Sequence, residues 1–237
     1  MLGMLDNWQS FAKRLSHDYM VIMLDLRNHG RSSHDRLMTY DLMAFDVQQF
    51  MEQNWLYEGA VVMGHSMGGK VAMQLAAVHP ELVKKLTVVD MAPSDYEPAY
   101  WGLFNALQGI VLEDIDRRGE VLEQLMEKLG DEAVVGFLAK NLARNRDGSF
   151  FWRMNLPAII SNYELLLKAP PFPKTLVEVP TLFIKGANSS YIQQEQINHI
   201  DQKFSTYEIV EIQDAGHWVH ADNPDELEKT VVSWFKP

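Results

Sequence analysis

Short apolar runs alternate with longer amphipathic stretches along most of this chain. The runs are four to eight residues long, which is typical of strands buried on both faces, and the stretches between them are long enough for helices. This alternation predicts an α/β protein with a mostly parallel sheet and helices on both faces. The predicted strands are Tyr19–Leu26, Ala60–Met63, Lys85–Met91, Thr181–Lys185 and Tyr207–Ile212.

The helices predicted between these strands have recognisable starts. Asp6 and Asn223 stand where N-cap residues are expected, and Pro224 suits a first helical position. The predicted core helices are Asn7–Leu15, Tyr40–Trp55, Met67–Val78, Ile192–Lys203 and Asp225–Phe235.

The alternation stops in the middle of the chain, where every apolar pattern has helical spacing and no strand is expected. We interpret this part as a helical lid inserted into the core. The predicted core comprises residues 1–94 and 176–237, and the predicted lid comprises residues 95–175. The predicted lid helices are Pro98–Gln108, Arg117–Leu129, Asp131–Arg144 and Leu156–Lys168.

The composition argues against several function classes. The chain has 237 residues, a formal net charge of −11 and no cysteine. The negative charge argues against nucleic-acid binding, while the lack of cysteine excludes thiolate chemistry and fits a cytoplasmic location. No run of 18 apolar residues and no basic leader occur, so we expect neither a membrane span nor a signal peptide. Without a G-x-G-x-x-G, Walker A or H-E-x-x-H motif, we predict no cofactor and no metal.

The sequence GHSMGG, which begins at Gly64, lies between a predicted strand and a predicted helix. A G-x-S-x-G match alone is weak, but in this position it is the signature of a nucleophile elbow. Gly64 and Gly68 would remove side chains that clash in a sharp turn, and Gly69 would let the helix approach the sheet. Ser66 is therefore the candidate nucleophile, with the Met67 N–H as a candidate oxyanion donor. The alternative is a glycine-rich turn with a bystander serine.

A serine nucleophile needs a base, and His217 is the best candidate. It lies a few residues after the last predicted strand, on a loop expected above the carboxyl ends of the strands, where sites in open α/β sheets form. His220 is its only serious rival and is interpreted as a packing or hydrogen-bonding residue behind His217. The His65 side chain is expected to point away from Ser66.

The base needs a carboxylate that fixes its tautomer, and two loops could supply it. The segment 186–190 after the strand Thr181–Lys185 contains no acid, whereas Asp90 stands at the end of the preceding strand. We therefore predict Asp90 as the acid, with Asp95 as a more distant alternative. A capping role is the other interpretation of Asp90.

Four segments of the chain, taken together, resemble the α/β-hydrolase superfamily and are most similar to the YbfF-type acyl esterases. The resemblance extends over essentially the whole chain and implies a serine esterase or thioesterase that acts on acyl esters. It also implies an acid at the position of Asp90. The segments that carry it are Asp25–Ser32, Gly64–Lys70, Val89–Pro93 and Gly216–His220.

The same resemblance implies three N-terminal strands that this sequence lacks. In the family the third strand ends in His-Gly and is followed by a loop that donates the second oxyanion N–H. Here the segment Gly3–Trp8 matches the far end of that loop, so this donor falls near Met1 and Leu2. In the family the third strand lies between the fourth and fifth strands, which correspond here to Tyr19–Leu26 and Ala60–Met63. Without the third strand, these two would pair directly, leave a gap or recruit another chain.

The predicted function is hydrolysis of short- to medium-chain acyl esters or thioesters through an acyl-enzyme. Two alternatives stay open: a carbon–carbon bond hydrolase or lyase with the same triad, and a catalytically impaired binding protein. The candidate substrate-binding residues are Trp218, Trp152 and His65. The expected partner is a small-molecule substrate, and an open strand edge would also allow a homodimer.

Overall fold

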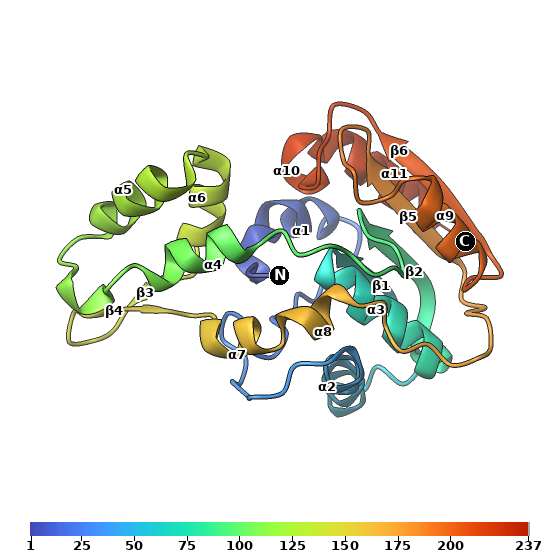
Figure 1. Cartoon of the computed structure of the whole chain (residues 1–237). Helices are drawn as coiled ribbons and strands as arrows, with labels where there is room; N and C mark the ends of the chain where they lie inside the picture. The colour runs from blue at the N-terminus through green and yellow to red at the C-terminus, as the bar shows by residue number, and fades with distance from the viewer. Residues whose placement is uncertain (237) are drawn as a thin grey trace.

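A parallel sheet forms the centre of the molecule, as the computed structural model shows for residues 1–236 (Figure 1). Its strands follow the order β1-β2-β5-β6, and every neighbouring pair is parallel. This arrangement confirms the α/β fold class with helices around a parallel sheet. The strands are β1 (Ala60–His65), β2 (Val83–Val89), β5 (Thr181–Gly186) and β6 (Tyr207–Ile212).

Helices cover both faces of this sheet because its side chains alternate between two apolar clusters. In β5, Leu182 and Ile184 pack in one cluster, whereas Phe183 between them packs in the other. The first cluster includes side chains of α1 and α11, and the second includes side chains of α2, α3 and α9. The core helices are α1 (Gln9–Leu15), α2 (Tyr40–Gln53), α3 (Met67–Val78), α9 (Gln194–Asp201), α10 (Val219–Asp222) and α11 (Pro224–Phe235), and the short 3-10 turns are Leu5–Asn7, Pro80–Leu82 and Leu112–Asp114.

The predicted helix starts are confirmed at one end of the chain and wrong at the other. Asn223 caps α11, because its side chain accepts a hydrogen bond from the Glu226 N–H, and Pro224 is the first helical residue. Asp6 instead lies within the 3-10 turn Leu5–Asn7, so Trp8 precedes α1. That turn forms because the Asn7 side chain binds the Met4 N–H and competes with a continuous helix.

The predicted strand Tyr19–Leu26 is wrong, because no strand lies beside it. The described chain has no strand before β1, and β1 pairs on one side only, with β2. The segment is extended but unpaired, and its alternate residues Met20, Ile22 and Leu24 are 83%, 45% and 37% exposed. A groove of about 960 Å³ lies between this segment and β1. Within one chain, Tyr19–Leu26 and Ala60–Met63 therefore do not pair directly, and a gap separates them. Recruitment of another chain stays a prediction.

The lid is inserted between β2 and β5, and it is not entirely helical. Leu142–Arg144, predicted as the end of a helix, instead pairs with Phe150–Trp152 in a two-stranded antiparallel hairpin. Its turn is made by Asn145 and Gly148, whose backbones are hydrogen-bonded, and Gly148 has a φ of +94°. An Asp-Gly pair favours such a turn over a continuing helix. The lid elements are α4 (Trp101–Gln108), α5 (Arg118–Leu129), α6 (Glu132–Ala139), β3 (Leu142–Arg144), β4 (Phe150–Trp152), α7 (Leu156–Ser161) and α8 (Tyr163–Leu167).

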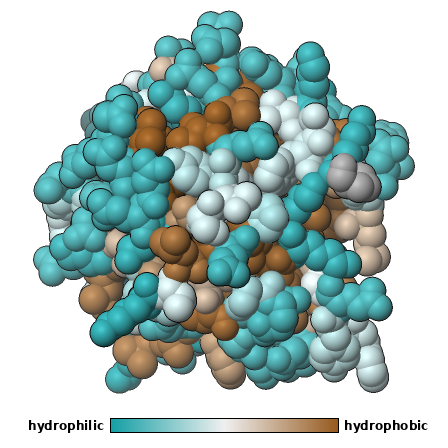
Figure 2. All heavy atoms as spheres, turned by 90° about the vertical axis from the view of Figure 1, so that its right-hand side faces the viewer, coloured by the Kyte–Doolittle hydropathy of each residue, from teal (hydrophilic) through white to brown (hydrophobic). Residues whose placement is uncertain are grey.

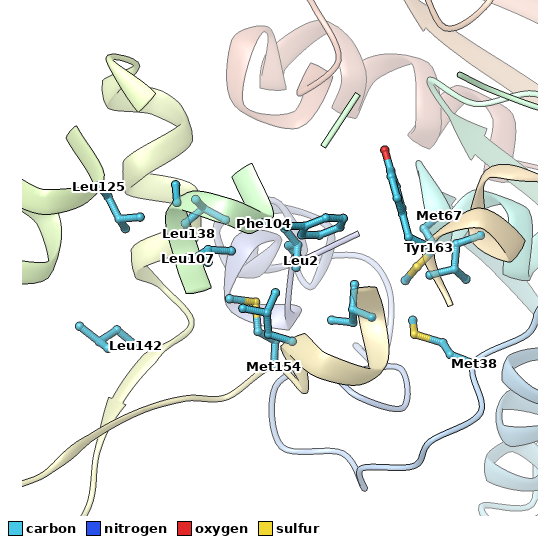
Figure 3. Packing of buried hydrophobic residues seen from close by; sticks show 14 of the residues in the cluster. Leu2, Met38, Met67, Phe104, Leu107, Leu125, Leu138, Leu142, Met154 and Tyr163 are labelled. Carbon is cyan, nitrogen blue, oxygen red and sulfur yellow. The ribbon is translucent and has the colours of Figure 1, made fainter. Parts of the chain in front are cut away.

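One continuous apolar cluster joins the lid to the core. Figure 3 shows it running from Leu125 in the lid past Phe104 to Met67 at the start of α3. The side chain of Leu2 lies beside Phe104 and is 1% exposed. Figure 1 accordingly places the start of the chain between the lid helices and the sheet. The lid therefore packs on the N-terminal segment and on helices α2 and α3 of the core, while its predicted limits at residues 95 and 175 stay a prediction.

Polar contacts hold the last lid helix against the core. The Lys70 ammonium, on α3, donates hydrogen bonds to the carbonyls of Leu167 and Lys168 at 3.0 and 2.6 Å. The Tyr40 hydroxyl donates to the Leu166 carbonyl at 2.5 Å. These are carbonyls that a helix leaves without partners at its C-terminus. Burial lowers the pKa of Lys70 to about 7.

The surface is polar over most of the face that carries β6 and α9. Figure 2 shows hydrophilic residues around its outline, with hydrophobic patches between them. Within residues 1–236, no helix combines the length and apolar character needed to cross a bilayer.

Where β5 ends, the chain crosses itself so closely that only glycine fits. A Cβ on Gly186 would lie 2.3 Å from the Gly216 carbonyl oxygen and 2.6 Å from that of Ala215. We expect Gly186→Ala to lower the free energy of unfolding by about 1–3 kcal/mol, because backbone must move to admit the methyl group. Urea unfolding followed by circular dichroism measures this.

Gly136→Ala is the matched control, because a Cβ at Gly136 in α6 would meet nothing within 4 Å. It should leave the free energy of unfolding unchanged or raise it by up to about 1 kcal/mol, since alanine favours helix. Equal unfolding curves for the two variants would contradict the predicted crossing.

Candidate active site

Ser66 occupies a strained turn between β1 and α3. Its φ and ψ are 54° and −125°, a conformation that non-glycine residues rarely adopt. The Ser66 N–H donates a hydrogen bond to the Val89 carbonyl at 3.1 Å, which fixes the turn to the neighbouring strand. Ser66 itself is 6% exposed but lines the cavities described below.

The glycines around Ser66 have different roles. A Cβ on Gly64 would lie 2.2 Å from the Gly68 carbonyl oxygen, so the turn requires glycine there. A Cβ on Gly69 would approach Val88 to 3.0 Å, which agrees with close packing of the helix on the sheet. The expectation for Gly68 is wrong: a Cβ there would meet nothing within 4 Å, because this residue borders the groove.

His217 lies between Ser66 and Asp90 in a chain of hydrogen bonds. Its Nε2 is 3.0 Å from the Ser66 Oγ, and its Nδ1 is 2.7 Å from the Asp90 Oδ2. Because a carboxylate only accepts, Nδ1 carries the proton and Nε2 is free to accept one from the serine hydroxyl. The ring of Tyr191 stacks on the imidazole at 4.0 Å with an interplanar angle of 18°.

Asp90 is a fully buried carboxylate held by donors from another loop. It has a φ of +49° at the end of β2. One oxygen accepts the Gly186 N–H at 3.1 Å, and the other accepts both His217 Nδ1–H and the Ser189 hydroxyl. Sequence reasoning missed Ser189. The signal was its place on the loop after β5, which has no acid but supplies donors instead.

The rivals to these residues lie elsewhere. Asp95 forms an exposed ion pair with Lys168 at 3.0 Å. His220 stacks on Trp8 with ring centroids 4.1 Å apart, so the packing role expected for it is observed. Burial lowers the pKa of His220 to about 4.

Three residues were expected to provide the oxyanion site. Met67 is the first residue of α3, so its N–H has no carbonyl to bind within the helix and lies at the positive end of the helix dipole. Met1 lines both cavities beside Ser66. Leu2 has a φ of +60° and its carbonyl accepts a hydrogen bond from the Asn141 side chain at 2.8 Å. The structure thus brings Met67 and Met1 next to Ser66, whereas the Leu2 side chain packs in the lid core.

Two spaces of very different size meet at Ser66. A cavity of about 50 Å³ extends from Ser66 to Lys70, and it is lined mostly by aromatic and apolar side chains. The groove of about 960 Å³ reaches Ser66 from the other side and is bordered by His217 and Trp218. The side chains that line the smaller cavity include Tyr40, Met91, Tyr96, Tyr100, Tyr163, Leu166 and Tyr191.

The three residues expected to bind substrate lie in three different surroundings. Trp218 borders the groove and stacks on Phe137 of the lid at 5.3 Å, so it lies at the entrance to the site. Trp152 belongs to β4, packs against the lid core and lines neither of the two spaces, so its role in substrate binding stays a prediction. His65 borders the groove, but its Nε2 lies 2.7 Å from the His217 carbonyl oxygen.

The arrangement is suited to nucleophilic chemistry. A hydroxyl lies beside an imidazole nitrogen that can accept its proton, and a buried carboxylate fixes the other nitrogen. Across residues 1–236, no group of three or more His, Asp or Glu side chains is gathered closely enough to hold a metal ion. The absence of a cofactor stays a prediction.

Comparison with known proteins agrees with this geometry. The sequence profile of the alpha/beta hydrolase fold family matches residues 1–224. Esterase YbfF of Escherichia coli is 32% identical over 98% of this chain and 88% of its own length. The sn-1-specific diacylglycerol lipase ABHD11 of Danio rerio is 36% identical over 100% of this chain and 76% of its own length. A solved marine microorganism esterase is 35% identical, with a TM-score of 0.96 over 99% of this chain and 92% of its own. The chain therefore belongs to the alpha/beta hydrolase fold family, among its ester hydrolases.

Proposed function

We propose that this protein is a serine hydrolase that cleaves acyl esters or thioesters through an acyl-enzyme. The observation that carries the proposal is the hydrogen-bond chain from Ser66 through His217 to Asp90. The Ser66 Oγ attacks the acyl carbonyl carbon while His217 Nε2 takes the hydroxyl proton. The tetrahedral intermediate collapses, and the imidazolium gives that proton to the departing alcohol or thiol. Water then attacks the acyl-Ser66 ester with His217 again as the base.

Fixed polar and charged groups stabilise the charges that develop during this reaction. The oxyanion forms at the start of α3, where the Met67 N–H is unpaired within the helix. The imidazolium forms against Asp90, whose carboxylate is already oriented by Gly186 and Ser189. We propose Met1 and Leu2 as the region of the second oxyanion donor, which is supported by the position of Met1 beside Ser66.

The two spaces at Ser66 support short- to medium-chain acyl substrates. We propose that the acyl chain enters the cavity of about 50 Å³ and that the leaving group lies in the groove. The cavity is far smaller than the groove, which suits the shorter part of the substrate unless its walls move. That a related protein is named as a diacylglycerol lipase supports ester substrates with a large leaving group.

The homodimer and the cytoplasmic location stay predictions. The unpaired outer edge of β1 and the exposed apolar residues Met20 and Ile22 support association with a second copy. The lack of cysteine supports a reducing compartment.

Ser66→Ala tests the nucleophile. We expect the purified protein to hydrolyse p-nitrophenyl butanoate, and the substitution to lower kcat by about 10⁴-fold or more while the midpoint of thermal unfolding changes little. A fluorophosphonate probe followed by mass spectrometry should label the wild-type protein on Ser66. Equal hydrolysis rates for the two proteins would exclude the mechanism, and labelling without turnover would indicate the catalytically impaired alternative.

Leu166→Ala tests the assignment of the acyl cavity. Leu166 is 6% exposed and lines this cavity, whereas its neighbour Leu165 is 55% exposed and does not. In the wild type, we expect kcat/KM to fall by about tenfold or more from the butanoate to the octanoate ester of p-nitrophenol, since a cavity of about 50 Å³ has little room for the longer chain.

Leu166→Ala should reduce the ratio of kcat/KM for the butanoate ester to kcat/KM for the octanoate ester at least several-fold, because it removes part of the cavity wall. Leu165→Ala serves as the matched control and should keep the wild-type ratio. If both variants showed the same chain-length profile, the acyl chain would not occupy this cavity.

A further inference from the structure

His65 directly precedes Ser66, yet its imidazole contacts the loop that carries His217. The His65 Nε2 lies 2.7 Å from the backbone carbonyl oxygen of His217. Because a carbonyl oxygen only accepts, the His65 Nε2 must carry a proton and donate it. This bond links the strand of the nucleophile to the loop of the base.

The surroundings of His65 keep it neutral, which preserves this donor without adding charge. Burial lowers the pKa of His65 well below its usual range, and the nearby His217 and His220 lower it further. The ring centroid of His65 is 4.6 Å from that of His217, 5.5 Å from that of His220 and 5.6 Å from that of Trp8. A charged His65 would oppose the imidazolium that forms on His217, so neutrality suits catalysis.

The base loop has further backbone anchors, but they come from other elements. The Gly216 N–H donates to the Asp222 carboxylate at 2.8 Å, and the Ala215 carbonyl accepts the Asn188 N–H at 2.9 Å. Neither of these bonds involves β1, the strand that ends beside Ser66. The bond from His65 therefore fixes the backbone of His217 relative to the nucleophile itself.

We infer that His65 is a positioning residue that holds His217 at the correct distance from Ser66 by donating a hydrogen bond to its backbone carbonyl. This role differs from the substrate binding expected for His65 and rests on the proposed serine mechanism. A shift of about 1 Å in a reacting group can cost about 100-fold in rate, so loss of this bond should affect the chemical step more than substrate binding.

The matched variants are His65→Gln and His65→Met, which have side chains of similar length. Glutamine keeps an N–H donor near the position of Nε2, and methionine does not. We expect His65→Met to lower kcat by about 10–100-fold with KM within about twofold of the wild type. His65→Gln should stay within about fivefold of the wild-type kcat, because it rescues the donor. His65→Phe, which keeps the ring without the donor, should behave like His65→Met.

Active-site titration separates positioning from a loss of folded protein. Rates are expressed per Ser66 labelled by the fluorophosphonate probe, so a variant that merely folds poorly keeps the wild-type kcat per labelled site. Equal kcat values per labelled site in His65→Met and His65→Gln would overturn the inference.

A second measurement does not depend on turnover. Nitrogen-15 NMR of the imidazole side chains reports which ring nitrogen carries the proton, and we expect the neutral Nε2–H form for His65 at pH 7. Observation of the Nδ1–H form would overturn the inference. Failure of the wild type to hydrolyse esters or to react with the probe would instead contradict the proposed function, and the NMR result would still decide whether the His65 Nε2 carries the proton.

Discussion

The buried carboxylate of Asp90 is the constraint around which the carboxyl edge of the sheet is organised. A fully buried carboxylate is costly unless several donors compensate for the water it has lost. Here the donors come from the loop after β5, through Gly186 and Ser189, and from the loop after β6, through His217. Satisfying one charge therefore brings three separate parts of the chain together, and the candidate site is a consequence of that requirement.

The order of the strands makes this gathering geometrically simple. Because β1, β2, β5 and β6 are parallel neighbours, their carboxyl ends lie along one edge of the sheet. Ser66 follows β1, Asp90 follows β2, and His217 lies beyond β6. The backbone strain at Ser66 and Asp90, which both have positive φ, is compensated by hydrogen bonds between neighbouring strands and loops. Lid residues Tyr100, Tyr163 and Leu166 line the smaller of the two spaces beside Ser66, while the larger groove reaches Ser66 from the other side.

Local patterns predicted the features that depend on local interactions. The need for glycine at positions 64 and 69, the N-cap at Asn223 and the helix Met67–Val78 follow from sterics and capping within a few residues. The segment Tyr19–Leu26 has the composition of a strand, but strand formation requires a partner that composition does not supply. For the same reason, the bond from His65 to the His217 carbonyl could not be predicted, since it joins residues distant in sequence. The donor from Ser189 to Asp90 is also distant in sequence, and its one signal was the place of Ser189 on the acid-free loop after β5.

The most direct test of this account compares Asp90→Asn with Ser189→Ala in single-turnover acylation of Ser66. Asparagine keeps the shape of the side chain but loses the charge and the preference for the Nδ1–H tautomer of His217. The account predicts that Asp90→Asn slows acylation by about 10³–10⁴-fold. Ser189→Ala removes one donor to the same carboxylate and should slow it by only about tenfold or less. Acylation by Asp90→Asn at a rate within a few-fold of the wild type would contradict the account.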